Sequence, residues 1–370
     1  MLNLPPRLAA HAAVLRGALH EGALRAGLAP SRMRDLPGSL DSTVLLLGPG
    51  ADIVNGGLLS IATIADETEA LLGPGGPRVL MCTLPGDPFL DRYTRFDCAR
   101  PLYPLSAVLP RLSAEGVHLV HVPELWTARV GRWFEARKAR LPQGVRFNIL
   151  LQNIDLCPAR ADVDRLRAFG PLSCSTAHEA YTSAAMAERL GVPTHLLGVI
   201  LSAKRFERRP EAEKSRLMLF SPDPHPCRDA VIARAREGLP DVETRIIRGL
   251  TYREYKAAIA AARHTLTFGE GLDGYFVESI FSGAVSIAVY NDRFFTPDFV
   301  GCPGVFPSWD DLMRDLPTFL QAMRDPARFA DVQARQFALV DAIYDGERYT
   351  GRLEALYRDY HPMLLKKERT

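Results

Sequence analysis

Two glutamates, Glu270 and Glu278, flank a glycine-rich stretch whose residue types suit the binding of an anion and of hydroxyl groups. Three glycines within residues 269–274 leave the backbone too free for a helix interior. The apolar run 264–268 before them predicts a strand, and the helical spacing of residues 275–282 after them predicts a helix. A loop that leaves a strand and opens a helix gathers unpaired backbone N–H groups, which favour an anion. The carboxylates beside it could accept hydrogen bonds from hydroxyls.

The stretch 264–288 resembles the E-x7-E signature of retaining glycosyltransferases that have the GT-B fold. It matches that signature at Glu270, Gly271, Glu278, Gly283, Ile287 and Ala288. It departs from it at Leu272, Asp273, Tyr275 and Val285, where the signature has Phe, Gly, Pro and Pro. Together with the FTPDFV sequence at 295–300, the stretch also resembles the donor site of inverting fucosyltransferases. Both resemblances imply a nucleotide-sugar site on a GT-B scaffold, and they differ on the stereochemistry of transfer.

The retaining resemblance implies a role for several residues of this stretch. Glu270 would face the transferred sugar, and Glu278 would accept hydrogen bonds from the ribose hydroxyls. Gly271, Gly274 and Tyr275 would complete the donor loop.

The same resemblance implies cations for the diphosphate in the loop after the first strand of the second domain. That loop, SPDPHPCRD, contains no lysine, so Ser221, His225 and Arg228 are the candidates there. Arg248 and Lys256 are further candidates for the phosphates. Gly249 and Tyr252 stand where such enzymes contact the base.

Apolar runs and helical patterns alternate along the rest of the chain, which indicates parallel, doubly wound sheets. The first run, 43–47, leads into a glycine-containing turn and a helix. Ile53 occupies the third glycine position of a dinucleotide fingerprint, and no Gly-Lys-Ser/Thr follows, so neither phosphate-loop motif is present. Gly56 and Gly57 either approach the donor phosphates, as in GT-B enzymes, or form a plain turn.

The predicted fold class is α/β, with two doubly wound Rossmann-like domains facing across a cleft, as in GT-B proteins. Charged residues without apolar periodicity divide the two alternating sets and predict a linker. The expected parts are an N-terminal helical appendage (1–40), an acceptor-side domain (41–201), a linker (202–215), a nucleotide-sugar-side domain (216–345) and a C-terminal helix that crosses back (346–370).

An inverting reaction would need a general base, and the carboxyl ends of the first-domain strands offer His178, Asp155 and Glu124. Each is also explained by a structural role. The Asp-Val-Asp sequence at 162–164 opens an amphipathic helix, where aspartate is favoured, and is therefore not interpreted as a metal site. No metal and no cofactor are expected, because the nucleoside-diphosphate sugar is a co-substrate.

Composition excludes several other classes. The 370 residues carry a net charge of +2 with acids and bases interspersed, so no nucleic-acid footprint is present. The six cysteines are scattered, as in a reduced cytosolic protein. No apolar run reaches the roughly 20 residues of a membrane span. A helix predicted at 8–28 lies in a region, 1–40, with five Arg against one Glu and one Asp, so it either touches a membrane surface or packs on its own domain.

These observations predict a cytoplasmic glycosyltransferase, either free or peripheral at the inner face of the membrane. It would move a sugar from a nucleoside-diphosphate sugar to a glycan or lipid-linked saccharide in bacterial surface polysaccharide synthesis. The E-x7-E spacing favours retention of configuration. Two alternatives stay open: an inverting, fucosyltransferase-like enzyme, and a non-catalytic GT-B-like scaffold that binds sugar nucleotides.

Overall fold

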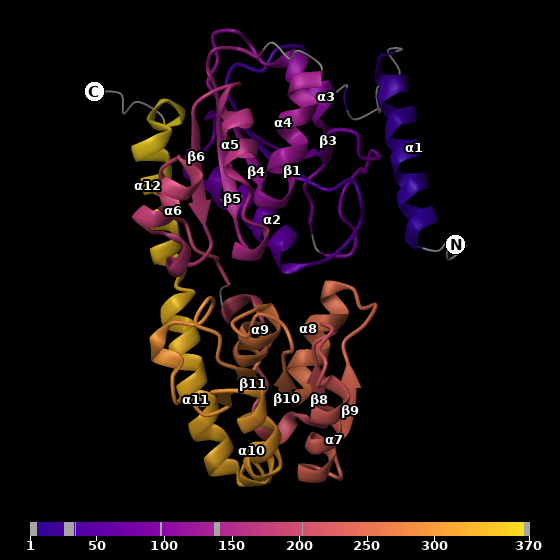
Figure 1. Ribbon diagram of the computed structural model, residues 1–370, viewed down its shortest axis with the longest axis vertical. Helices are drawn as coiled ribbons and strands as arrows, with labels where there is room; N and C mark the ends of the chain where they lie inside the picture. Colours follow the sequence, from indigo (N-terminus) through magenta and orange to yellow (C-terminus); the bar gives the residue numbers. More distant parts are fainter. Residues whose placement is uncertain are drawn as a thin grey trace. The chain divides into compact units, whose positions relative to one another are not determined.

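A computed structural model describes residues 6–25, 33, 35–96, 98–136, 141–201 and 203–365. The chain divides into two compact units (Figure 1). The first unit comprises Met1–Val199 and Tyr349–Thr370, and the second comprises Ile200–Arg348. Each unit is a parallel sheet with helices between successive strands, which confirms the predicted α/β class with two Rossmann-like halves.

The first unit contains, in its described residues, a seven-stranded sheet in the order β3-β2-β1-β4-β5-β6-β7. Every neighbouring pair is parallel. The strands are β1 (Thr43–Gly48), β2 (Arg78–Thr83), β3 (Leu102–Pro104), β4 (His118–Pro123), β5 (Val145–Leu151), β6 (Leu172–Thr176) and β7 (Thr194–Leu196). The helices are α1 (Pro6–Arg25), α2 (Gly56–Leu72), α3 (Leu105–Val108), α4 (Thr127–Ala136), α5 (Arg160–Arg167), α6 (Ala184–Leu190) and most of α12 (Gly346–Tyr360).

The second unit contains a five-stranded parallel sheet in the order β12-β11-β10-β8-β9. Its strands are β8 (Ser215–Phe220), β9 (Glu243–Ile246), β10 (Ala262–Leu266), β11 (Val285–Val289) and β12 (Val305–Phe306). Its helices are α7 (Arg228–Gly238), α8 (Tyr252–Ala261), α9 (Gly274–Phe281), α10 (Trp309–Ala322) and α11 (Pro326–Ile343). Within this unit β8 comes first, β9 pairs with one side of it, and β10 pairs with the other side. The loops after β8 and β10 therefore leave in opposite directions, at a switch point where such sheets bind ligands.

Alternating side chains explain how the second sheet is covered on both faces. Met218, Phe220, Leu266 and Ile287 point to one face, where they form a core with α7 and α10. Val285, on the same face as Ile287, packs in a neighbouring core with the start of α11. Ser286, between them, points to the other face, where its hydroxyl donates to the Phe276 carbonyl oxygen of α9 at 2.9 Å. Because both faces are buried, the strands are nearly continuous apolar runs, which is why the sequence reveals them.

Residues 177–190 do not form one continuous helix. Glu179–Tyr181 form a short 3-10 turn, and α6 begins only at Ala184. The physical reason is Ser183, which has an extended backbone and whose side chain accepts a hydrogen bond from Met186 N at 3.1 Å. A serine in this geometry caps a helix and prevents it from extending backwards.

Residues 203–215, the described part of the expected linker, are grouped with the second unit and pack on it. Lys214 Nζ donates hydrogen bonds to the carbonyl oxygens of Ala260 (3.0 Å) and Ser282 (2.9 Å). Arg208 donates to Gln333 Oε1 at 2.7 Å. These contacts attach the segment to helices α8, α9 and α11.

A buried polar network attaches the end of the chain to the sheet of the first unit. His121 Nδ1 lies 3.1 Å from Asn148 Oδ1, and Asn148 Nδ2 donates to Ser173 Oγ at 2.9 Å. Ser173 Oγ lies 3.4 Å from Nε2 of His361, which follows α12. Burial lowers the pKa of His121 to about 4 and that of His361 to about 3. Both rings are therefore neutral at physiological pH.

The N-terminal helix predicted at 8–28 is α1, and residues 26–28 of that prediction lie outside the described residues. In the part of the chain that the structure describes, no helix is both long and apolar enough to cross a membrane.

Candidate functional site

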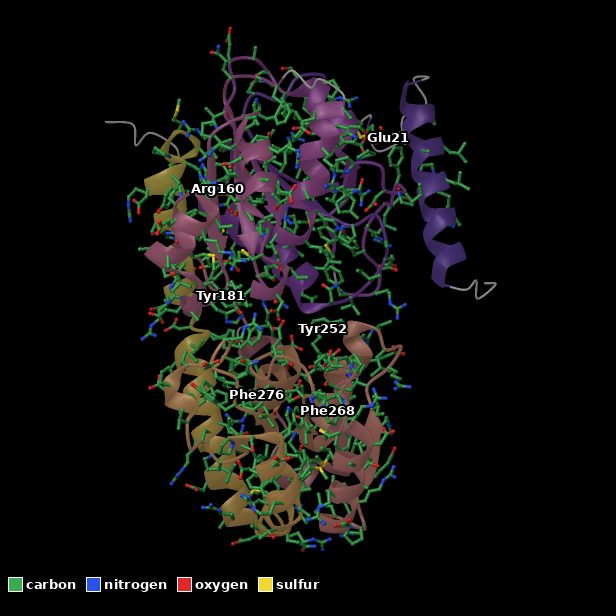
Figure 2. The ribbon with its side chains drawn as sticks, viewed as in Figure 1. Glu21, Arg160, Tyr181, Tyr252, Phe268 and Phe276 are labelled. Carbon is green, nitrogen blue, oxygen red and sulfur yellow. The ribbon has the colours of Figure 1, made fainter. Side chains whose placement is uncertain are left out.

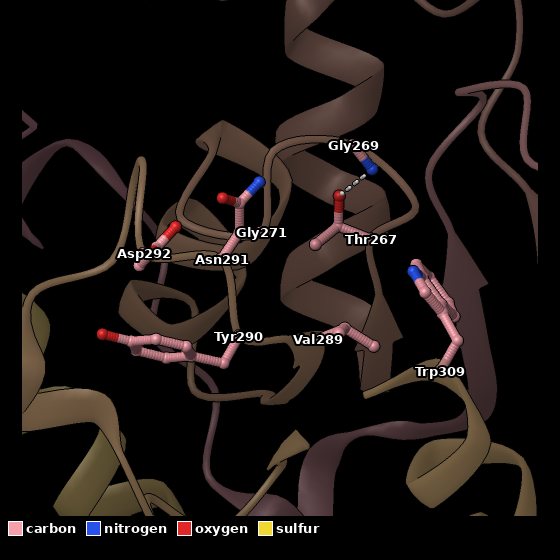
Figure 3. Close-up of a pocket in the computed structure, with 8 residues that line it drawn as sticks. All are labelled: Thr267, Gly269, Gly271, Val289, Tyr290, Asn291, Asp292 and Trp309. Atoms are coloured by element: carbon pink, nitrogen blue, oxygen red, sulfur yellow. Dashed lines mark hydrogen bonds between the residues drawn. The ribbon is translucent and has the colours of Figure 1, made fainter. Parts of the chain in front are cut away.

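The glycine-rich loop lies where β10 and β11 end, as the sequence predicts for a ligand site. A pocket of about 400 Å³ opens there (Figure 3). Its walls come from three places: the loop after β10, the end of β11 with its following turn, and the first residue of α10. The lining residues are Thr267, Gly269, Gly271, Val289, Tyr290, Asn291, Asp292 and Trp309.

Asp273 fixes the loop and starts α9. Its carboxylate accepts hydrogen bonds from Phe276 N (3.0 Å) and from the Thr267 hydroxyl (2.5 Å), while Thr267 Oγ1 accepts from Gly269 N (3.1 Å). Burial, together with the nearby negative charges of Asp223 and Glu270, raises the pKa of Asp273 to about 7. The E-x7-E signature has glycine here, so the sequence did not identify this capping role.

Glu278 is buried, with 4% of its surface exposed. The Tyr252 hydroxyl donates to Glu278 Oε1 at 3.1 Å, and Tyr255 also hydrogen-bonds the carboxylate. Burial raises the pKa of Glu278 to about 7, and the two tyrosines partly oppose the rise. The structure thus brings together Tyr252 and Glu278, with Gly274 beside them, since a Cβ on Gly274 would lie 3.6 Å from Glu278 Oε1.

Glu270 is half-buried and stands between two glycines that line the pocket. Its charge contributes to raising the pKa values of Asp273 and Tyr344, which places it within electrostatic reach of both. Tyr275 is half-buried against Tyr255, with ring centroids 5.6 Å apart, and burial raises its pKa to about 12.

Position 271 requires glycine for two reasons, its backbone conformation and the closeness of its neighbours. It has φ of +93°, and a Cβ there would lie 2.4 Å from Phe295 Cε2 and 3.0 Å from the Val289 carbonyl oxygen. We predict that Gly271→Ala destabilises the second unit by about 2–4 kcal/mol and deforms the pocket. Gly301→Ala is the matched control, because Gly301 has φ of +76° but nothing within 4 Å of a Cβ. Equal losses in thermal unfolding would show that backbone strain alone, and not the close contact, matters.

The loop after β8 contacts residues of the pocket, although its own residues do not line it. Ser221 Oγ accepts from Phe268 N at 2.9 Å, which holds the loop to the end of β10. The His225 ring stacks on Trp309 at 4.0 Å, and its Nδ1 lies 2.9 Å from Cys227 Sγ. Arg228 begins α7, and its buried Nε has no hydrogen-bond partner among the described residues but lies 3.7 Å from Asp229 Oδ1, at ion-pair distance.

Two other candidates lie on the loop after the edge strand β9. Arg248 and Gly249 are exposed, and neither lines the pocket. Lys256, on α8, lies over the Tyr252 ring at 4.9 Å. Its charge contributes to lowering the pKa of Glu278, so Lys256 is closer to the site than the sequence indicates.

The first-unit candidates lie at strand ends or at a helix start. Gly56 and Gly57 begin α2, which Asn55 caps by accepting from Leu58 N at 2.8 Å. Gly57 lies against Gln152, whose Oε1 would be 2.6 Å from a Cβ. Asp155 is exposed on a short turn after β5.

His178 and Glu124 differ as candidate bases. Burial lowers the pKa of His178 to about 4, so its ring is a weak base, and it contacts Tyr181 edge-on at 5.1 Å. Glu124 is buried at the end of β4 and accepts from Asn153 N at 3.0 Å. Burial raises the pKa of Glu124 to about 7, which is better matched to proton transfer at neutral pH.

Asp162 and Asp164, which were not interpreted as a metal site, form ion pairs on α5. Asp162 pairs with Arg165 at 2.6 Å, and Asp164 pairs with Arg160 at 3.1 Å. Across the described residues, no group of three His, Cys, Asp or Glu side chains could hold a metal ion.

Sequence reasoning missed six pocket residues: Thr267, Val289, Tyr290, Asn291, Asp292 and Trp309. Asn291 and Asp292 follow β11 and could have been found by extending the strand-end rule to that strand. Trp309 could not have been found in this way. It begins α10, and its position at the pocket depends on the order of the strands in the sheet, which the sequence does not reveal.

No protein-family model and no curated protein matches the sequence. Solved structures do match. The HepE protein of Anabaena, in complex with UDP and glucose, has a TM-score of 0.58 and 10% identity, covering 86% of this chain and 100% of that chain. Sucrose-phosphate synthase from Thermosynechococcus elongatus has a TM-score of 0.55 and 14% identity, covering 87% and 100%.

An alpha-glucosyltransferase in complex with UDP-glucose and DNA also matches, with a TM-score of 0.55 and 8% identity, covering 89% of this chain and 100% of that chain. At such identities a shared structure does not imply a shared activity. What the likeness establishes is the architecture: this chain has the GT-B fold, with two Rossmann-like units in one polypeptide.

Proposed function

We propose that the chain is a cytoplasmic glycosyltransferase that takes a sugar from a nucleoside-diphosphate sugar and transfers it to a glycan or lipid-linked saccharide. The observation that carries this proposal is the pocket at the glycine loop, which is lined by the two glycines on either side of Glu270 and is followed by the helix that carries the buried Glu278. Proteins of the same fold have been solved with UDP and glucose or with UDP-glucose. Bacterial surface polysaccharide synthesis is the setting we propose.

The charges around the site suggest how the donor lies. The pocket lining contains no lysine or arginine, but it has a tryptophan ring and amide and carboxylate oxygens. Such a lining suits a neutral, hydroxyl-rich sugar better than a diphosphate. The diphosphate is better served by the N–H groups that start α9 and by Arg228. Glu278 would then hold the ribose, and Gly249 and Tyr252 the base.

Glu270 is the residue that we place at the transferred sugar. We predict that Glu270→Gln lowers kcat by on the order of a hundredfold with little change in the unfolding temperature, because the side chain is half-buried and the substitution preserves its shape. Release of nucleoside diphosphate from the sugar nucleotide measures this. Glu243→Gln, at an exposed glutamate on β9, is the control. Undiminished turnover in Glu270→Gln would show that Glu270 takes no part in the reaction.

We favour retention of configuration because of the E-x7-E spacing. The anomeric configuration of the product distinguishes retention from inversion. An inverting reaction would instead need a first-unit base, for which the pKa values favour Glu124 over His178.

The test of the function begins with a thermal-shift screen against UDP, GDP, CMP, ADP and dTDP. A ligand that binds only the folded state stabilises it, by roughly 2.7 kcal/mol at 100 times its Kd. The sugar nucleotides of the base that shifts are then assayed for turnover. The missing lysine of the β8 loop favours one other function, a non-catalytic sugar-nucleotide-binding scaffold. Binding without turnover of any such sugar nucleotide would support the scaffold and contradict the enzyme.

A further inference from the structure

Helix α1 packs on the first unit through its small and polar residues. A Cβ on Gly17 would lie 1.9 Å from the Gly86 carbonyl oxygen, so the helix backbone touches that loop directly. His20 Nδ1 accepts from Phe89 N at 2.8 Å, and the two rings stack at 4.7 Å. Glu21 is buried and accepts from the Ser106 hydroxyl at 2.8 Å (Figure 2).

The opposite side of α1 carries Leu15 and Leu19, which are four residues apart and are 66% and 71% exposed. Val14 lies seven residues before Glu21, on the same side of the helix as that glutamate, and is 68% exposed. A surface helix of a globular domain normally buries such residues and exposes its polar ones. Here the arrangement is reversed, so the apolar side of α1 is available to a partner.

The charge next to these residues identifies the kind of partner. Arg16 is exposed beside the apolar residues. Residues 1–40 contain five arginines against Glu21 and Asp35, and Glu21 faces the protein. An apolar stripe bordered by arginine fits the interface of an anionic lipid bilayer, where leucines enter the acyl boundary and arginines meet the headgroups.

A second copy of the chain fits this surface less well. Stable protein interfaces bury about 1,200–2,000 Å² in total, and two aliphatic side chains on one helix supply only a small part of that area. We therefore propose that the surface formed by Leu15, Arg16 and Leu19 binds the chain to anionic membranes. This proposal stands on α1 alone and does not depend on the activity of the second unit.

The experiment is co-sedimentation of the full chain with vesicles of phosphatidylcholine, with and without phosphatidylglycerol. Binding is expected only when phosphatidylglycerol is present, and to weaken as salt is added. The double variant L15Q/L19Q is expected to bind on the order of a hundredfold more weakly, since each leucine contributes about tenfold when it enters the bilayer. Arg16→Gln is expected to bind about fivefold more weakly.

Met363→Gln is the matched control, because Met363 is also in the first unit and is 66% exposed. It should bind like the wild type. Unfolding temperatures equal to wild type would confirm that all variants fold. The proposal fails if the wild type ignores phosphatidylglycerol or if L15Q/L19Q binds as well as the wild type. It also fails if light scattering shows a lipid-independent dimer that L15Q/L19Q disrupts, which would assign the surface to a second copy.

Discussion

Replacing Glu278 with glutamine is expected to stabilise the second unit at pH 8 and, at the same time, to weaken donor binding. The pKa of the buried carboxyl is about 7, against 4.5 for an ordinary glutamate. A pKa raised on folding gives stability that is fully present below pH 4.5 and is lost as the pH rises to about 7. At about 1.4 kcal/mol per pH unit, the loss at pH 8 is roughly 3 kcal/mol, and glutamine avoids it.

The expected loss of donor binding follows from the proposed contact with ribose. Hydrogen bonds to a charged group contribute about 1.5–3 kcal/mol each, so losing the carboxylate should weaken nucleotide binding by on the order of a hundredfold. Thermal unfolding at pH 5 and pH 8, with and without nucleotide, measures both effects. Glu237→Gln, at an exposed glutamate on α7, should change neither. A Glu278→Gln variant that binds nucleotide normally would exclude Glu278 from the site.

Lowering the pH from 6.5 to 5 is expected to destabilise the first unit. Burial lowers the pKa values of His121 and His178 to about 4 and that of His361 to about 3, all from 6.5. Stability from such groups is lost as the pH falls below 6.5. Burial raises the pKa of Glu124 to about 7, so Glu124 has the opposite effect and offsets the contribution of one of the three histidines. The pKa values of His118 and His195, in the same unit, are also lowered by burial and act in the same direction as the other histidines. The groups with large shifts alone give a net two protons, which is a loss of roughly 3 kcal/mol per pH unit.

The second unit should behave oppositely over the same range. Asp273 and Glu278 have pKa values raised to about 7, so the fold gains stability as the pH falls towards their ordinary values. His264, with a pKa lowered to about 3 by burial, and His225, whose pKa burial also lowers, oppose them in part. Acidification should therefore separate unfolding into two transitions, with the first unit melting earlier.

Tryptophan fluorescence can follow the two transitions, because Trp126 and Trp133 belong to the first unit and Trp309 to the second. A variant with Phe at 126 and 133 reports the second unit, and Trp309→Phe reports the first. If the second unit melted first at pH 5, the burial of these ionisable groups would have to differ from the structure.

Much of the fold could be predicted because both sheets are buried and parallel. Runs such as 43–47 and 78–83 stand out as apolar, and the glycine turns between them mark where strands end. Short edge elements were missed, since β12 has two residues and carries no periodicity. The order of strands depends on long-range pairing, so it could not be deduced from local patterns.

The candidate site was predictable only where its residues are neighbours in sequence. Glu270, Gly271 and Glu278 lie in one segment, and their positions around one loop follow from its strand–turn–helix pattern. The burial of Glu278 depends on Tyr252 and Tyr255 from α8, and the pocket wall depends on Trp309 from α10. Those contacts arise from packing between elements, which no single stretch of sequence specifies.

Hydrogen–deuterium exchange tests the central claim, that a sugar nucleotide binds at the strand ends of the second unit, most directly. The full chain is compared without ligand and with whichever nucleotide raises its unfolding temperature. Slower exchange is expected in residues 221–228, 267–278 and 289–292, because the ligand would cover those backbone N–H groups. Protection confined to the first unit, or no change in these three segments, would contradict the account.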